Sequence, residues 1–211
     1  MEEIVIVGSS GLAKEIAFLV EEVNKIDMKW NIIGFIDTNI GEKVGKYSIV
    51  MNDEDLLDYK KKINVIIGVG FPNLIKKLSN KFKKNNNLLF PNIIHPNCIG
   101  DWDYIQFGEG NIVTAGNIFT TDIKIKSFNI FNLNGTIGHD TSIGSYNIFN
   151  PTNSISGNVC IEDETLIGTG AQVLQNISIE KEVIIGAGAV VTKNVTEKGI
   201  YVGSPAKKLV R

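Results

Sequence analysis

The chain has 211 residues, a formal net charge of −2 and 43% hydrophobic residues, which supplies enough apolar side chains for a packed core and argues against disorder. The charge gives no general basic surface, so nucleic-acid binding is disfavoured. The start MEEIVIVGSS is acidic, unlike a signal peptide, and no apolar run approaches the ~20 residues of a membrane span. We therefore expect a cytoplasmic protein that does not span a membrane.

The first 93 residues alternate between strand and helix signals. EIVIVG at 3–8 is rich in β-branched residues, as buried strands are, and SGLAKEIAFLVEEVN at 10–24 places its apolar residues on one helical face. Strands that alternate with helices predict a small parallel α/β sheet. In chain order the sequence predicts a strand at 3–8, a helix at 10–24, a strand at 31–37, a helix at 52–62, a strand at 63–70, a helix at 71–86 and a short strand at 87–90.

From about residue 94 helical spacing disappears, and from Phe107 an apolar residue recurs at every sixth position without a break. This period predicts a parallel β-helix in which each hexad forms one side of a triangular coil and points its apolar residue inward. Small residues that directly follow, such as Gly138 and Gly144, are expected toward the corners. Residues 192–211 leave the repeat and are expected to fold back as a cap. The fifteen apolar positions are Phe107, Val113, Phe119, Ile125, Phe131, Ile137, Ile143, Phe149, Ile155, Ile161, Ile167, Val173, Ile179, Ile185 and Val191.

The hexads, with the segments VIIGAGAVVTKNV and GIYVGSPAKKLVR that follow them, resemble the bacterial hexapeptide-repeat acyltransferases with a left-handed β-helix. Three earlier segments, IVIVGSSGLAKEIAFLV, IIGFIDTN and IIHPNCIG, resemble the sugar-acetyltransferase branch of that family. That branch contains nucleotide-aminosugar N-acetyltransferases and sialic-acid O-acetyltransferase-like proteins. The resemblance extends over nearly the whole chain.

The resemblance implies an α/β Rossmann-like nucleotide-sugar-binding domain over 1–93 and an all-β left-handed parallel β-helix, the acetyltransferase domain with its C-terminal cap, over 94–211. It implies transfer of an acetyl group from acetyl-CoA to the amine of a UDP- or dTDP-linked 4-amino-deoxysugar, in bacterial surface-glycan biosynthesis. It also implies a homotrimer with the acetyl-CoA site between subunits, and no metal is expected.

His139 is one of two histidines in the chain and lies in the segment NGTIGHD. An imidazole titrates in the range needed to take a proton from a sugar amine and return it to the thiolate that leaves. A solvated corner histidine is the alternative, but the family places its catalytic histidine here. Asp140 matches a family glutamate that orients the histidine, and the two side chains can meet only if the backbone bends between them.

The segment GSSG follows the first predicted strand and opens a helix, where unpaired amides can hold a phosphate. A plain strand-to-helix turn is the alternative, because the dinucleotide pattern GxGxxG is absent. In the family this loop binds the nucleotide together with the acid that ends the second strand, and Asn132 matches an asparagine placed near the sugar. Leu12 stands where some members have a histidine or an aromatic residue. The predicted substrate-binding residues are Gly8, Ser9, Ser10, Gly11, Asp37 and Asn132.

The resemblance also implies an acetyl-CoA site along the coils of the β-helix, where small residues let the pantetheine arm approach the backbone. Ordinary coil corners are the alternative. Ile148 occupies a position nine residues after His139 where the family often has a second histidine, so a polar contact is lost there. Lys207 and Lys208 could attract the phosphates of CoA or belong to a solvated tail. The predicted cofactor-binding residues are Ile148, Gly157, Thr169, Gly170, Ala187 and Lys207.

Other functions stay open on the sequence alone. Sugar O-acetylation, as in sialic-acid enzymes, uses the same base. Metal-dependent hydration of the carbonic-anhydrase type needs three histidine ligands, whereas the chain has only His95 and His139. An NAD(P) oxidoreductase lacks its glycine pattern, and a non-catalytic scaffold would need no histidine. We expect His95 to be structural and Cys98 and Cys160 to be reduced thiols that are not nucleophiles.

Overall fold

A computed structural model describes residues 1–210, and the chain divides into two compact units, Met1–Pro96 and Asn97 onward. The sequence places the boundary after residue 93, and the two compact units meet three residues later.

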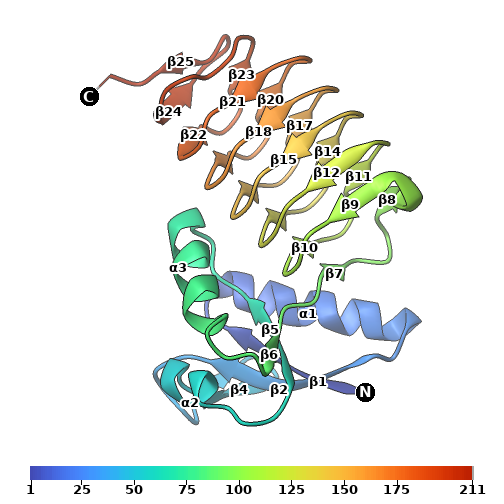
Figure 1. The fold of residues 1–211 in the computed structure, drawn as a ribbon, viewed down its shortest axis with the longest axis vertical. Coiled ribbons are helices and arrows are strands. Elements are labelled where there is room, and N and C mark those ends of the chain that lie inside the picture. Colours follow the sequence, from blue (N-terminus) through green and yellow to red (C-terminus); the bar gives the residue numbers. More distant parts are fainter. Residues whose placement is uncertain (211) are drawn as a thin grey trace. The chain divides into compact units, whose positions relative to one another are not determined.

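The first unit is a six-stranded sheet with strand order β3-β4-β2-β1-β5-β6. Every pairing is parallel except that between β3 and β4. Helix α1 contacts β1, β2 and β7, whereas α3 contacts α2 and β5 (Figure 1). The elements are β1 (Glu2–Val7), α1 (Gly11–Ile26), β2 (Trp30–Ile36), β3 (Lys43–Val44), β4 (Tyr47–Met51), α2 (Asp53–Leu57), β5 (Ile63–Ile67), α3 (Pro72–Phe82), β6 (Leu88–Leu89) and β7 (Ile93–Ile94).

Several elements of the first unit differ from the prediction, among them the helix expected over 71–86, which ends at Phe82. The helix expected over 52–62 ends at Leu57, and the side-chain amide of Asn85 donates to the carbonyls of Leu57 and Tyr59, which therefore have a partner outside a helix. Strand β4 was not predicted. Its sequence YSIVM is too short for a clear strand pattern. The segment forms a strand because it pairs with β2, which lies earlier in the chain.

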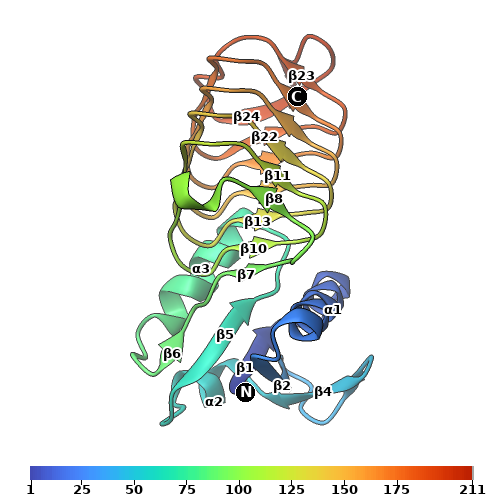
Figure 2. The same ribbon diagram turned by 90° about the vertical axis from the view of Figure 1, so that its right-hand side faces the viewer.

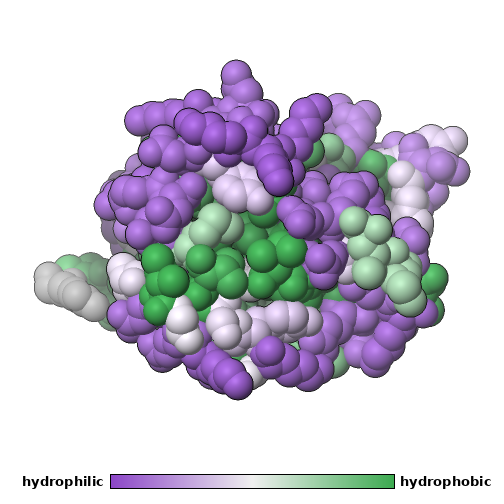
Figure 3. Space-filling model, turned by 90° about the horizontal axis from the view of Figure 1, so that it is seen from below, coloured by the Kyte–Doolittle hydropathy of each residue, from purple (hydrophilic) through white to green (hydrophobic). Residues whose placement is uncertain are grey.

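The surface of the molecule is not uniformly hydrophilic. The face shown in Figure 3 carries a group of apolar side chains at its centre, surrounded by hydrophilic ones. No helix in residues 1–210 is both long enough and apolar enough to cross a bilayer.

The second unit is the predicted left-handed β-helix (Figures 1 and 2). Its strands form three faces, which are numbered in the order in which the chain passes through them within a coil. The first face contains β10 (Ile112–Val113), β13 (Ile130–Phe131), β16 (Ile148–Phe149), β19 (Leu166–Ile167), β22 (Val183–Ile185), β24 (Gly199–Val202) and β25 (Lys207–Lys208). The second face contains β8 (Ile99–Gly100), β11 (Ile118–Phe119), β14 (Thr136–Ile137), β17 (Ser154–Ile155), β20 (Gln172–Val173) and β23 (Val190–Val191). The third face contains β9 (Ile105–Phe107), β12 (Ile123–Ile125), β15 (Ser142–Ile143), β18 (Cys160–Ile161) and β21 (Ser178–Ile179).

The apolar residue of each hexad forms the core of the β-helix, as predicted. All fifteen positions are buried except Phe107, which is half-buried in an early coil. Phenylalanine rings pack against one another in the interior: Phe131 and Phe149 are stacked with ring centroids 4.7 Å apart, and Phe119 meets Phe131 edge-to-face at 5.2 Å. This column of rings excludes water from the interior, so that the parallel ladders between coils are enclosed by apolar side chains.

The corners turn at a position that differs from the prediction. Positive φ recurs at the third residue after each apolar position, whereas Gly138 and Gly144, which directly follow an apolar residue, do not have positive φ. Asparagine and aspartate adopt this left-handed conformation more readily than most residues do. The non-glycine residues with positive φ are Asp122, Phe128, Asn134, Asp140, Tyr146, Thr152, Asn158, Glu164, Asn176 and Glu182.

The C-terminal residues continue the coil further than expected. Val195 bridges to Ile179 on the third face, and β24 pairs in parallel with β22 on the first face. The chain then turns through residues 203–206 and returns as β25, antiparallel to β24. The fold-back therefore begins only after Val202.

Candidate active site

His139 and Asp140 meet at the corner between the second and third faces, after β14 and before β15. Nδ1 of His139 lies 2.7 Å from Oδ2 of Asp140. Adjacent side chains of a strand would diverge, but Asp140 has a φ of 57°, and this left-handed turn brings its carboxylate back to the ring. The two side chains are 53% and 61% exposed, so solutes reach both groups.

The backbone around this pair is held by the neighbouring coils. The amide of Asp140 donates to the carbonyl of Thr121 in the preceding coil, and the carbonyl of His139 accepts from the amide of Asn158 in the next. Gly157 lies one coil beyond His139, is buried, and has its Cα beside the imidazole. The pair therefore projects from a rigid ladder.

In the first unit, the loop after β1 and the end of β2 are joined by a side-chain hydrogen bond. The hydroxyl of Ser9 donates to Oδ2 of Asp37 at 2.6 Å, and the amide of Thr38 donates to Oδ1 at 2.7 Å. The Ser9 donation, opposed by burial and assisted by Thr38, lowers the pKa of the Asp37 carboxyl below its ordinary value. Asp37 is therefore an anion over the physiological pH range.

A cleft of about 430 Å³ opens beside this hydrogen bond, at the carboxyl ends of β1 and β2. Of the predicted substrate-binding residues, Gly8 and Asp37 line it. Ser10 is instead the exposed N-cap of α1, Gly11 is the first residue of that helix, and neither lines the cleft. The sequence did not identify the other lining residues, although a parallel sheet brings the ends of its strands to one edge. They are Val7, Ile36, Thr38, Asn52, Asp53, Glu54, Val69, Leu74 and Leu78.

The remaining candidates in the β-helix border one face. His139, Asp140 and Gly157 lie at the corner between the second and third faces. Asn132, Thr169, Gly170 and Ala187 lie at the corner between the first and second faces. Both corners flank the second face, and the amide of Gly188, next to Ala187, donates to the carbonyl of Thr169 in the coil before.

Two predicted cofactor-binding residues lie elsewhere. Ile148 belongs to β16 on the first face and is only 3% exposed, so that its side chain presents no open contact surface in this chain. Lys207 is exposed on β25. The neighbouring Lys208 pairs with Glu197 at 2.7 Å, a contact that raises the pKa of the Lys208 amine.

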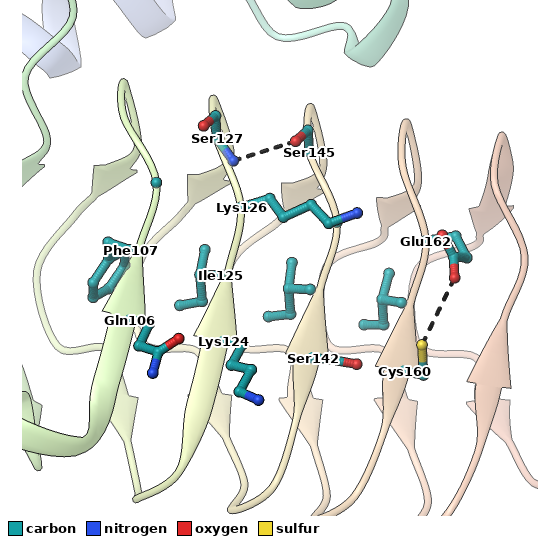
Figure 4. A pocket seen from close by; sticks show the side chains of 14 residues that line it. Gln106, Phe107, Lys124, Ile125, Lys126, Ser127, Ser142, Ser145, Cys160 and Glu162 are labelled. Atoms are coloured by element: carbon teal, nitrogen blue, oxygen red, sulfur yellow. Dashed lines mark hydrogen bonds between the residues drawn. The ribbon is translucent and has the colours of Figure 1, made fainter.

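A shallow groove of about 600 Å³ runs along the third face and was not predicted (Figure 4). Gln106, Lys124, Ser142 and Cys160 project from successive strands along it, and Lys126 and Glu162 lie nearer the next corner. A second hollow of about 460 Å³ adjoins it and is lined by Asp140. Within residues 1–210, no three His, Cys, Asp or Glu side chains group as metal ligands.

Both units of the chain resemble known proteins. Residues 3–82 match the PglD N-terminal domain family. The whole fold is similar to perosamine N-acetyltransferase from Caulobacter crescentus, solved with CoA and GDP-perosamine (TM-score 0.91, 23% identity, 100% of this chain and 98% of that one).

Two further structures have the same architecture. They are the acetyltransferase domain of PglB from Neisseria gonorrhoeae FA1090 (TM-score 0.91, 23% identity, 99% of this chain and 100% of that one) and WeeI from Acinetobacter baumannii AYE (TM-score 0.86, 29% identity, 99% of this chain and 100% of that one). A comparison with curated proteins finds no match.

Proposed function

We propose that this chain, which joins a PglD N-terminal domain to the left-handed β-helix of the hexapeptide-repeat sugar acetyltransferases, is an acetyl-CoA-dependent N-acetyltransferase that acts on a nucleotide-linked aminosugar. The observation that carries the proposal is the exposed His139–Asp140 pair at 2.7 Å on a β-helix corner. Structures of the same fold bind CoA with GDP-perosamine, or acetyl coenzyme A.

In this proposal the role of each ring nitrogen of His139 follows from the contact between Nδ1 and Asp140. When Nδ1–H donates to the Asp140 carboxylate, the lone pair of the neutral imidazole is on Nε2, which becomes the general base. The amine nitrogen attacks the thioester carbonyl carbon while Nε2 takes the amine proton. The carbon–sulfur bond then breaks, and the proton passes from Nε2 to the thiolate of CoA. The products are an N-acetylated sugar and free CoA.

The oxygen of the thioester becomes negative during this step, and backbone amides are its natural partners. Among the described residues, the amide of Gly157 has no hydrogen-bond acceptor, and it lies beside the His139 ring. We place the acetyl group there. The pantetheine arm would run along the second face toward Thr169, Gly170 and Ala187, where exposed small residues leave the backbone accessible.

In the first unit, the cleft beside Asp37 is the proposed site for the nucleotide. The carboxylate accepts hydrogen bonds from N–H or O–H groups, which a base or a ribose presents, while the amides of Ser10 and Gly11 at the start of α1 can hold a phosphate. Neither this cleft nor the His139 corner is a complete site by itself. A homotrimer, in which a second copy completes the acetyl-CoA site, is part of the proposal.

A thiol-release assay with acetyl-CoA tests the function. The acceptors are UDP-, dTDP- and GDP-linked aminosugars, with UDP- and dTDP-linked 4-amino-deoxysugars expected to react. The matched controls are the same nucleotide sugars with a hydroxyl in place of the amine. An alkali-stable product identifies an amide, whereas an alkali-labile product from the hydroxyl controls would assign sugar O-acetylation instead. Absence of thiol release with every acceptor would overturn both.

A further inference from the structure

Gly157 is the only glycine in the column of residues that contains His139, at the corner between the second and third faces. Residues 18 apart repeat the same place in successive coils, which puts Thr121, His139, Gly157 and Gln175 in one column. A residue with a side chain at position 157 would place its β-carbon beside the side chain of residue 139. The glycine leaves that space empty, and the imidazole of His139 extends into it.

The distances at Gly157 show what the missing side chain would meet. A β-carbon there would lie 2.5 Å from Nε2, 2.6 Å from Cε1 and 2.9 Å from Cδ2 of His139. All three are closer than non-bonded carbon and nitrogen atoms can approach, and all three belong to the same ring. The outer edge of the imidazole, including the proposed base atom, therefore rests against the backbone of Gly157.

The conformation of Gly157 does not require glycine. Its φ lies outside the left-handed region, unlike that of Gly170. Gly138 is different, because a β-carbon there would lie 2.5 Å from the backbone nitrogen of Gly157, so that residue is needed for close backbone approach. At Gly157, by contrast, the three atoms nearest to a β-carbon all belong to the His139 side chain.

We infer that Gly157 is a positioning residue, whose missing β-carbon seats the His139 ring between the Asp140 carboxylate and the backbone of the next coil. The Asp140 contact fixes Nδ1, and the seat on Gly157 fixes the opposite edge of the ring, which includes Nε2. The effect of Gly157 on turnover rests on the proposed function, but the position of the His139 ring against Gly157 does not.

Gly157→Ala tests this inference. Because His139 is half exposed, its ring can swing toward solvent, and we expect the variant to fold with the Asp140 contact broken. A displacement of about 1 Å at a reacting group lowers turnover by about 100-fold, so kcat should fall by that factor. In the His139→Ala/Gly157→Ala protein the alanine should cause no loss beyond that of His139→Ala, because the ring that it displaces is gone.

A spectroscopic measurement is independent of substrate. With His139 and His95 as the only histidines, the imidazole cross-peaks in a proton–carbon correlation spectrum are assigned from His139→Ala. Gly157→Ala should move the His139 peak and leave the His95 peak in place. Gly135→Ala is the matched control, since the three atoms nearest to a β-carbon there belong to the side chains of Asn117 and Asn153, at the corner between the first and second faces and away from His139. It should leave the His139 peak in place.

The outcomes separate the two proposals. An unmoved His139 peak, or a loss of turnover that multiplies with that of His139→Ala, would overturn the positioning role. If the peak moves but His139→Ala keeps full turnover, the seat exists and the proposed catalytic role of His139 is wrong.

Discussion

The carboxylate of Asp140 lies 2.7 Å from Nδ1 of His139, although the two residues are neighbours in the chain. Such neighbours face opposite sides of a strand, and only the left-handed φ of 57° at Asp140 lets them meet. The same conformation recurs in three other coils at this corner, at Asp122, Asn158 and Asn176. The repeat therefore supplies the geometry, and the histidine supplies the chemistry.

His139→Ala removes the proposed base. Proton transfer by a positioned side chain contributes about 10²- to 10⁴-fold, so we expect turnover to fall by at least about 100-fold. The side chain is half exposed and lies outside the apolar column, so the fold should persist. Steady-state kinetics and circular dichroism measure the two effects. Imidazole added to the variant should restore part of the rate, and near-normal turnover without it would show that His139 is not the base.

Asp140→Asn keeps a residue that tolerates left-handed φ but removes the charge opposite Nδ1. A hydrogen bond to a charged group contributes about 1.5 to 3 kcal/mol, and the exposure of this pair favours the lower end, which corresponds to about a tenfold fall in kcat. Asp122→Asn is the matched control, because Asp122 has the same conformation one coil earlier and makes no contact with His139. Equal kcat values for the two variants would contradict an orienting role for Asp140.

Ser9→Ala removes the donor that lowers the pKa of Asp37. A carboxyl whose pKa is lowered on folding stabilises the protein above its ordinary pKa, 3.8 for this group, and loses that contribution as the pH falls through the lowered value. We expect Ser9→Ala to lower the free energy of unfolding by about 1 kcal/mol at neutral pH, since the pair is partly exposed. The difference from wild type should shrink in acid.

Urea unfolding at a series of pH values measures this difference. Ser10→Ala is the control, because the Ser10 side chain makes no capping hydrogen bond at the start of α1. If the two alanine variants have the same pH dependence, Ser9 does not stabilise the Asp37 anion. A rise in KM for the nucleotide sugar in Ser9→Ala alone would support the proposed use of the cleft.

Phe131→Ala opens a cavity between two neighbouring phenylalanine rings. Phe131 is fully buried, with Phe119 and Phe149 on its two sides. Truncation of a buried phenylalanine costs about 3 to 5 kcal/mol, so the midpoint of urea unfolding should fall sharply. Phe18→Ala is the comparison, because Phe18 is 58% exposed on α1 and should change stability by less than about 0.5 kcal/mol. Similar midpoints for the two variants would show that the ring column does not stabilise the β-helix.

The sequence by itself determined the architecture of this protein. A six-residue period of apolar residues has one compact solution, because only a coil with three short sides per turn directs every sixth residue to a common axis. The same reasoning found α1, β1 and β2 from their apolar periodicity, and it singled out His139 as a titratable group that the repeat does not require. The local sequence pattern was sufficient to predict an element wherever buried residues recur at a fixed interval.

Only the tertiary structure decided the features that depend on neighbouring coils or distant strands. β4 exists through its pairing with β2, and Val195 and β24 extend the coil because earlier strands offer them partners. Asn52, Asp53 and Leu74 reach the cleft beside Asp37 because a parallel sheet gathers strand ends that lie far apart in the chain. Gly157 meets His139 across 18 residues for the same reason. A sequence records which side chains are present, whereas the backbone ladder decides which of them touch.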